Sequence, residues 1–413
     1  MQFRKQSLTP LNHKEFRYFI LSRFFYIMAL RMVATVVAYQ LFQLTKDSFS
    51  IGIVGLSEFI PVVSLALYAG HVIDKSDKRS LLLKGILSYS VCVLALIAIT
   101  LPALQKNFDV KTTALLFYVV IFFTGVIRAF AGPTSHAIIA QLVPRDVLQF
   151  AASISSSSWL SASILGHASA GFLIAGIGTN KTFMIIFALI LMSAFVLSKI
   201  EKKPAVQTNL NVKAWDSVKE GLQFVFRHKV LLGAISLDLF AVLFGGAVAL
   251  IPEFADEILN VGPIGFGWLN AAIDIGSVIT IVFITLVPLT RRQGYKLFYA
   301  IGIFGLCIVV FGLSRIYWVS FAALLIAGMV DGISVVIRGT VMQLTTPDEM
   351  RGRVSSVNSM FVNSSNELGQ FESGFTARIF GGASPAVIFG GCMTLLVVII
   401  TWLKAPDLRK FEY

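Results

Sequence analysis

Residues 70–79 read GHVIDKSDKR, and five of these ten side chains carry a formal charge at pH 7. This charged run separates two apolar stretches, residues 50–73 and 80–102. Each stretch is long enough to cross the hydrocarbon core of a bilayer, because a spanning helix needs about 20 apolar residues. We therefore expect a tight polar loop between two membrane-spanning helices.

The rest of the chain continues this pattern and predicts twelve spans. Hydrophobic residues make up 56% of the chain, charged residues make up 14%, and the mean hydropathy is +0.81. Soluble proteins carry about 25% charged residues, so most of this surface is expected to face lipid. The sequence predicts an all-α membrane protein. The predicted spans are residues 17–43, 50–73, 80–102, 112–141, 147–178, 182–200, 229–256, 262–288, 294–314, 316–344, 352–380 and 384–404.

One long polar connection divides the twelve spans into two sets of six. Residues 1–200 are predicted to form an N-terminal six-helix bundle, and residues 229–413 a C-terminal six-helix bundle. The linker, residues 201–228, carries apolar side chains at steps of three and four, which places them on one helical face. We expect an amphipathic helix at the cytoplasmic interface. Its apolar face comprises Trp215, Val218, Leu222 and Val225.

The distribution of Lys and Arg predicts the orientation in the membrane. With both termini inside, 24 of the 34 basic residues lie in cytoplasmic segments and five in external ones. Cytoplasmic loops of membrane proteins carry this excess of positive charge. We therefore expect a multi-pass protein of the cytoplasmic (inner) membrane of a bacterium, with both termini cytoplasmic. The same distribution explains the net charge of +12 without a nucleic-acid partner.

The two halves resemble each other at a constant offset of 203 residues. This register aligns spans four and five with spans ten and eleven, so the halves are expected to be pseudo-symmetric copies. Parallel repeats of this kind are typical of secondary transporters, whose substrate site lies between the repeats near the membrane midplane. The matching pairs are Gly125 with Gly328, Pro144 with Pro347, Gly166 with Gly369, Gly171 with Gly374, and Gly178 with Gly381.

The loop at residues 70–79 resembles the signature loop of the major facilitator superfamily, G-x-x-x-D-R/K-x-G-R-R/K, with Asp77 in place of the second glycine. The resemblance covers nearly the whole chain and is closest to the drug and siderophore exporter branch. It is carried by Phe16-Arg17, Ser22-Arg23, Leu142 to Arg145, Ser217 to Leu222 and Thr346 to Val354. It implies the fold of that superfamily, two six-helix bundles working by alternating access.

The resemblance also implies a cytoplasmic gate, in which charge contacts between helices stabilise the outward-open state. Asp74 with Arg79 is the expected element of the first half, and a related cluster follows span ten. The implied gate residues are Gly70, Asp74, Lys75, Arg79, Asp348, Arg351 and Arg353.

Ionisable side chains inside the spans are the candidates for substrate binding. Each costs roughly 2.5–3.5 kcal/mol at a helix centre, so such residues are expected to face a cavity or to pair. In the superfamily, spans one, four, seven and ten line the cavity, so an anionic group such as a carboxylate or catecholate is expected to be attracted there by Arg31 and Arg128. Static ion pairing is the alternative. The candidate substrate-binding residues are Arg31, Arg128, Asp238 and Asp331.

Several of the same groups are candidates for proton coupling. Burial in a low-dielectric cavity favours the protonated form of a carboxyl group, which can then exchange protons as access alternates. His167 lies in Gly166-His167-Ala168-Ser169-Ala170-Gly171, where exporters of the superfamily carry a G-P-x-x-G-G-like motif. It is either a proton carrier or a packing residue. The candidates are Glu58, Arg128, His167, Asp274, Asp331 and Glu372.

These observations favour a secondary transporter that exports small amphipathic or anionic organic molecules, such as siderophores or drug-like compounds, by proton antiport. Uptake, lipid translocation and a non-transporting membrane sensor remain alternatives. The sequence has no G-x-x-x-x-G-K-S/T motif and no His, Cys or carboxylate cluster at metal-ligand spacing. We therefore expect no enzyme activity, no metal and no cofactor. The expected partners are a small-molecule substrate, protons and the lipid bilayer, and the expected state is a monomer.

Overall fold

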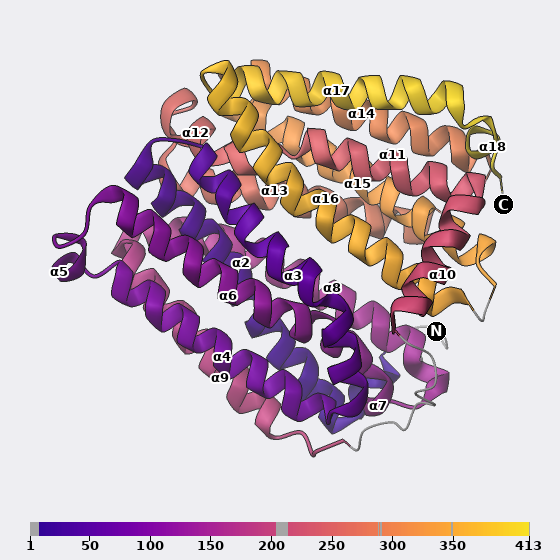
Figure 1. The fold of residues 1–413 in the computed structure, drawn as a ribbon, viewed down its shortest axis with the longest axis horizontal. Helices are drawn as coiled ribbons and strands as arrows, with labels where there is room; N and C mark the ends of the chain where they lie inside the picture. The colour runs from indigo at the N-terminus through magenta and orange to yellow at the C-terminus, as the bar shows by residue number, and fades with distance from the viewer. Residues whose placement is uncertain (1–7, 204–213, 288, 290, 348–349, 413) are drawn as a thin grey trace. The chain divides into compact units, whose positions relative to one another are not determined.

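The computed structural model describes residues 8–203, 214–287, 289, 291–347 and 350–412, and every regular element within these ranges is a helix. Two sets of six long helices are joined by α10 (Ala214–Arg227), which confirms the predicted fold class (Figure 1). The first set comprises α2 (Lys14–Thr45), α3 (Phe49–Lys75), α4 (Lys78–Ile99), α6 (Val110–Ala137), α8 (Leu148–Ile177) and α9 (Thr179–Ser198). The second comprises α11 (Lys229–Gly245), α13 (Gly262–Leu286), α14 (Gln293–Leu313), α15 (Tyr317–Thr345), α16 (Arg351–Phe380) and α17 (Ala383–Lys404).

Short helical segments cap or connect the long helices. They are η1 (Thr9–Asn12), α5 (Pro102–Gln105), α7 (Ile139–Leu142), η2 (Arg145–Val147), η3 (Ala247–Leu250), α12 (Ile251–Glu253), η4 (Phe254–Ile258) and α18 (Pro406–Arg409).

Eleven helices in the described ranges are long and apolar enough to cross a membrane. The twelfth, α16, has 30 residues, but its serine, asparagine and glutamate side chains lower its hydropathy. Large apolar side chains on the long helices are exposed to the surroundings, including Leu286 at 76% and Trp318 at 72%. A soluble protein rarely exposes so much apolar surface, so these faces are the ones that lipid covers.

Residue contacts divide the chain into two compact units. The first contains Met1–Gln40 and Ile60–Leu210, and the second contains Leu41–Phe59 and Asn211–Tyr413. The end of α2 and the start of α3 thus pack with the second unit.

Each unit repeats the same helix pairings, as the offset of 203 residues predicts. In the first unit α4 packs against α6 and α9, and in the second α14 packs against α15 and α17 (Figure 1). The repeated glycines Gly178 and Gly381 end α8 and α16 with φ angles of 83° and 75°. Glycine adopts this left-handed region without the steric cost that a side chain incurs.

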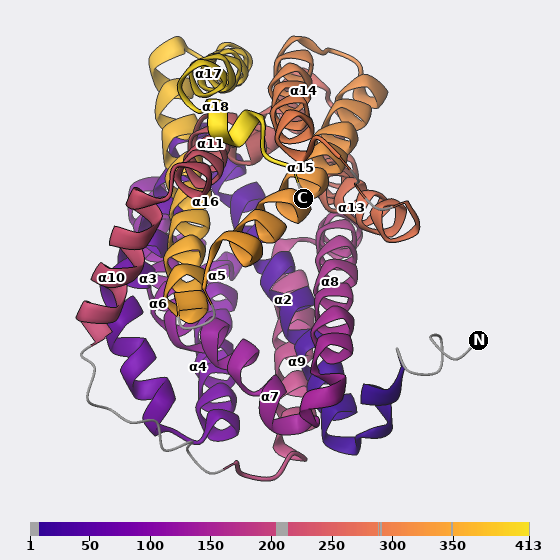
Figure 2. The ribbon, with the colours of Figure 1, turned by 90° about the vertical axis from the view of Figure 1, so that its right-hand side faces the viewer.

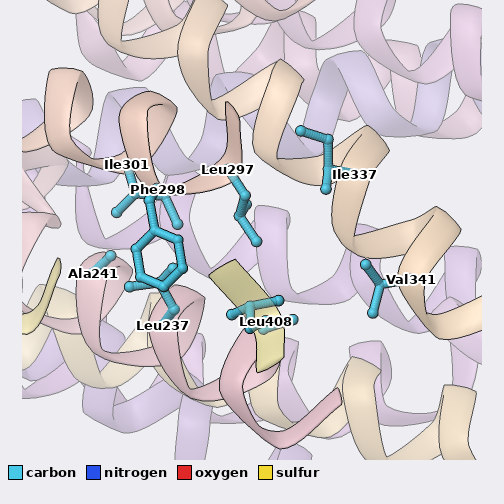
Figure 3. Packing of buried hydrophobic residues seen from close by; sticks show 9 residues of the cluster. Leu237, Ala241, Leu297, Phe298, Ile301, Ile337, Val341 and Leu408 are labelled. Carbon is cyan, nitrogen blue, oxygen red and sulfur yellow. The ribbon is translucent and has the colours of Figure 1, made fainter. Parts of the chain in front are cut away.

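The core of the second unit is made by helices that are distant in sequence. Leu237 and Ala241 of α11 pack with Phe298 of α14 and Ile337 of α15, and all of these side chains are buried (Figure 3). Leu408 of the short helix α18 joins the same cluster, and α18 lies across the ends of α11 and α14 (Figure 2).

The seventh predicted span, residues 229–256, is interrupted in the structure. Helix α11 stops at Gly245, and Gly246 leaves the helical region with ψ at 53°. The chain continues through η3, α12 and the π-helix η4, with Pro252 inside α12. Glycine and proline at this point account for the break, because glycine is flexible and proline lacks an N–H for the preceding turn.

Candidate substrate and proton sites

A buried ion pair joins two helices of the second unit. Asp238 of α11 and Arg338 of α15 are in direct contact, and their side chains are only 7% and 13% exposed. Arg338 Nε also donates a hydrogen bond of 3.1 Å to Ser334 Oγ, one turn earlier on α15. The guanidinium is therefore held by both helices.

Two further carboxyl groups belong to this charge cluster. Asp331 lies seven residues before Arg338, on the same face of α15, and interacts electrostatically with both Arg338 and Asp238. Asp274 of α13 interacts electrostatically with Asp331. The charge cluster, defined as Asp238, Asp274, Asp331 and Arg338, thus contains three acids and one base within one helical unit.

A small cavity lies beside the charge cluster. Asp238, Asp331 and Ser334 provide its polar lining, and the remaining wall is apolar. Its volume is about 10 Å³, which is room for about one water molecule. The space therefore suits water or a proton rather than an organic molecule. Its apolar lining residues are Ala241, Val242, Ala300, Ile301, Phe304 and Val330.

The first unit places Arg31 beside an aromatic side chain. The guanidinium carbon of Arg31, on α2, lies 4.7 Å from the ring centroid of Trp159, on α8, and both residues are half-buried. A guanidinium at this distance from an indole ring is attracted by its π electrons. Sequence reasoning missed Trp159, because no spacing rule links positions 31 and 159.

His167 lies where α8 meets α2. Its Nδ1 is 2.7 Å from Thr35 Oγ1, and the Thr35 hydroxyl donates to the Arg31 carbonyl at 3.0 Å. Since that hydroxyl has one proton to donate, its oxygen accepts from Nδ1–H of the imidazole. His167 thereby links the two helices close to Arg31.

The other candidates inside the spans are distributed over several helices. Arg128 lies near the middle of α6 and is half-buried. Glu58 on α3 and Glu372 on α16 are also half-buried, and both belong to the second unit. Their helices pack closely at Gly52, where an added Cβ would lie 3.2 Å from Gln370 O.

Residues 70–79 comprise the end of α3, a two-residue turn and the start of α4, and only some of their side chains are exposed. Gly70, Asp74 and Lys75 are exposed. Arg79 instead bonds to the end of α9, with Nε donating to Ile200 O at 2.9 Å and an Nη donating to Ser198 O at 2.5 Å. The described contacts therefore connect Arg79 with α9 and not with Asp74.

Asp77, the residue in place of the signature glycine, caps α4. Its carboxylate accepts hydrogen bonds from Ser80 and the backbone N–H groups of Arg79, Ser80 and Lys203. Burial acts to raise the pKa of Asp77, but these hydrogen bonds outweigh it and leave the pKa below its ordinary value. The charged carboxylate thus connects Lys203, near the start of the linker, with the N-terminus of α4.

In the second half, Arg353 of α16 forms an ion pair with a glutamate of α10. An Nη atom of Arg353 lies 2.5 Å from Glu220 Oε2 on α10. Gly221 allows this approach, because a Cβ there would lie 3.0 Å from Arg353 O. Arg351 is exposed at the start of α16, and the remaining gate candidate, Asp348, lies outside the described residues.

Two sets of six long helices, with ionisable side chains buried inside them, are the arrangement typical of secondary transporters. A model of the Major Facilitator Superfamily matches residues 19–370, and the chain belongs to this superfamily. It is a multi-pass membrane protein that moves small molecules, and it is not an enzyme.

Similar proteins agree with this assignment. The enterobactin exporter EntS of Shigella flexneri is 23% identical over 404 residues, covering 97% of this chain and 94% of that one. The uncharacterized transporter YfiS of Bacillus subtilis is 23% identical over 388 residues, covering 90% and 88%. Among solved structures, a D-xylose–proton symporter superposes with a TM-score of 0.75 at 13% identity, covering 97% and 100%. The nucleoside transporter NupG gives 0.73 at 14%, covering 94% and 99%.

Proposed function

We propose that this protein exports small amphipathic or anionic organic molecules, of siderophore or drug-like type, in exchange for protons. It would do so as a monomer in the cytoplasmic membrane of a bacterium, with both termini inside. The observation that carries the proposal is the charge cluster of the second unit, where Asp238 and Asp331 interact with one guanidinium and Asp274 interacts with Asp331.

The charge balance of this cluster favours proton exchange. With every group ionised, Asp238, Asp274, Asp331 and Arg338 would leave a net charge of about −2 inside a membrane-spanning unit, where each unbalanced charge costs roughly 2.5–3.5 kcal/mol. Binding a proton relieves this cost. The water-sized cavity beside Asp238 and Asp331 offers a place from which a proton arrives or leaves.

The three acids differ in how they interact with Arg338, and we assign them different roles. It is held by Asp238 and Ser334, so Asp238 is balanced by a direct partner. Asp331 interacts with the same guanidinium and also with the negative Asp274. We assign proton exchange to Asp331 and Asp274, and the fixing of Arg338 to Asp238.

The export direction and the substrate type rest on similarity and charge. The enterobactin exporter EntS matches nearly the whole chain, although at 23% identity. In the first unit, Arg31 and Arg128 supply positive charge within the spans, which suits an anionic substrate. The cytoplasmic gate is proposed to include Asp74 and Lys75 at the end of α3, Arg79 on α4 and Arg353 on α16.

Reconstitution tests the proposal directly. Purified protein in liposomes with an imposed pH gradient should drive accumulation of an anionic aromatic dye or siderophore, and the substrate should in turn dissipate the gradient. Asp331→Asn should abolish this coupling, whereas Asp109→Asn, at the exposed cap of α6, should leave it unchanged. Absence of coupling for every substrate tried would overturn proton antiport.

A further inference from the structure

The pair Arg31 and Trp159 sits at the end of a polar stripe on α8. Over the preceding turns of α8, the exposed positions are spaced so that they fall on one helical face. None carries a large apolar side chain. These positions, the α8 stripe, are Gln149, Ala152, Ser153, Ser156 and Ser157.

This composition differs from that of the lipid-facing surfaces. Exposed positions on neighbouring long helices carry large apolar side chains, such as Phe195 on α9 at 63% exposure. Hydroxyl and amide groups are costly in lipid unless they are satisfied or face water. The α8 stripe is therefore suited to a water-filled path, and Trp159 follows Ser156 by three residues on the same side of the helix.

Buried hydroxyls near the pair add unused hydrogen-bonding capacity. The Oγ atoms of Ser155 and Ser158 are buried and have no hydrogen-bond partner among the described residues. Ser155 precedes Trp159 by one helical turn and is 2% exposed. Buried hydroxyls are normally hydrogen-bonded, so these two indicate a place for a polar group of a ligand or for water.

The position of Arg31 is fixed by the packing of α2 against α8, which run side by side (Figure 2). A Cβ on Gly166 would lie 2.8 Å from Arg31 Cβ, so only glycine permits this approach. Thr35, bonded to both the Arg31 carbonyl and His167, holds the same turn of α2. Such support keeps a binding side chain in one geometry.

We propose that Arg31 and Trp159 form a subsite for an aromatic ring that carries a negative charge, such as an aromatic carboxylate or phenolate. This inference rests on the proposed transport of anionic organic molecules and specifies the part of the substrate recognised. The guanidinium supplies charge-assisted hydrogen bonds, and the guanidinium with the indole supplies a flat surface for the ring. An aliphatic anion uses only the first interaction, and a neutral aromatic molecule only the second.

Binding to the purified protein in nanodiscs, without any gradient, tests this subsite. Three probes of similar size separate the two interactions: benzoate, cyclohexanecarboxylate and benzyl alcohol. We expect benzoate to bind about tenfold more tightly than either of the others, as measured by saturation-transfer NMR competition. Equal binding of benzoate and cyclohexanecarboxylate would overturn the proposal.

Variants test whether Arg31 and Trp159 cause the preference for benzoate. Trp159→Leu should reduce the preference for benzoate over cyclohexanecarboxylate to about one, and Trp159→Phe should keep most of this preference. Arg31→Gln should remove the preference for benzoate over benzyl alcohol. Trp402→Leu is the matched control, because it removes a second arginine–tryptophan pair, Arg409 over Trp402 at 5.1 Å. An unchanged benzoate preference in folded Trp159→Leu would contradict the assignment.

The outcomes separate this subsite from the proposed antiport. Benzoate preference without coupling to a pH gradient would leave the subsite standing and overturn proton exchange. Coupling to a pH gradient without a preference for benzoate would leave proton exchange standing and overturn the subsite.

Discussion

Gly166 of α8 and Gly369 of α16, 203 residues apart, occupy the same position in their repeats. A Cβ on Gly166 would lie 2.8 Å from Met28 O of α2, and a Cβ on Gly369 would lie 2.9 Å from Val242 O of α11. In each half, the fifth long helix thus approaches the backbone of the first helix through a glycine. Small residues permit this close packing between membrane helices.

Larger side chains at these two glycines should therefore separate the helices. We expect Gly166→Val and Gly369→Val each to lower stability by about 1–3 kcal/mol, the usual cost of overpacking. Thermal unfolding in detergent measures the effect. Gly132→Val and Gly339→Val are controls, because a Cβ at either position meets nothing within 4 Å. Equal losses at all four glycines would show that the close approach is not the cause.

The buried ion pair gives a second prediction. Arg338→Met leaves Asp238 as an unbalanced buried carboxylate, so we expect a loss of about 3–5 kcal/mol. Asp238→Leu should cost less, because Arg338 keeps its interaction with Asp331. The double variant should lose less stability than the sum of the two single variants, because the direct pair is removed as a whole. Thermal unfolding of the four proteins forms a double-mutant cycle, and additive losses would contradict a direct pair.

A third prediction separates binding from coupling at Asp331. Asp331→Asn keeps the size and hydrogen-bonding capacity of the side chain but cannot exchange a proton. We expect substrate binding to persist within about threefold, while flux driven by a pH gradient falls by at least tenfold, or about 1.4 kcal/mol in the barrier. Paired measurements of binding and gradient-driven flux check this. Loss of both would place Asp331 in the substrate site instead.

The sequence predicted the helices well, because long apolar runs directly report spans. It also located α16, as the predicted span 352–380, despite the polar residues of this helix, and the repeat aligned this span with α8. The partners of buried charged side chains were harder to predict from the sequence. Arg338 could be recognised only as one of several arginines within the spans, and the role of Trp159 could not be predicted. Contacts between helices that are distant in sequence depend on tertiary packing, which no local sequence pattern encodes. The break after Gly245 was missed because the stretch stays apolar through Gly246 and Pro252.

The capping carboxylate Asp77 gives a prediction for pH. Burial acts to raise its pKa, but its hydrogen bonds lower the pKa below the ordinary value of 3.8. A carboxylate with a lowered pKa in the folded state stabilises the protein above its unfolded pKa, and this contribution is lost as the pH falls through the folded pKa. Asp77→Ala should therefore cost about 1 kcal/mol at pH 7, the usual value of a helix cap.

Below the ordinary pKa of 3.8, the unfolded chain binds a proton that the folded carboxylate of Asp77 binds only at lower pH, so the difference between Asp77→Ala and wild type should be smaller at about pH 3 than at pH 7. Thermal unfolding at the two pH values measures it. Asp74→Ala is the matched control, because Asp74 is exposed at the end of α3, three residues before Asp77, and should show little difference at either pH. A loss in Asp77→Ala that is the same at both pH values would mean that the hydrogen bonds of Asp77 do not depend on its charge. In that case the hydrogen bond between Lys203 N and the Asp77 side chain, which connects the linker with the start of α4, would not depend on the charge of the carboxylate.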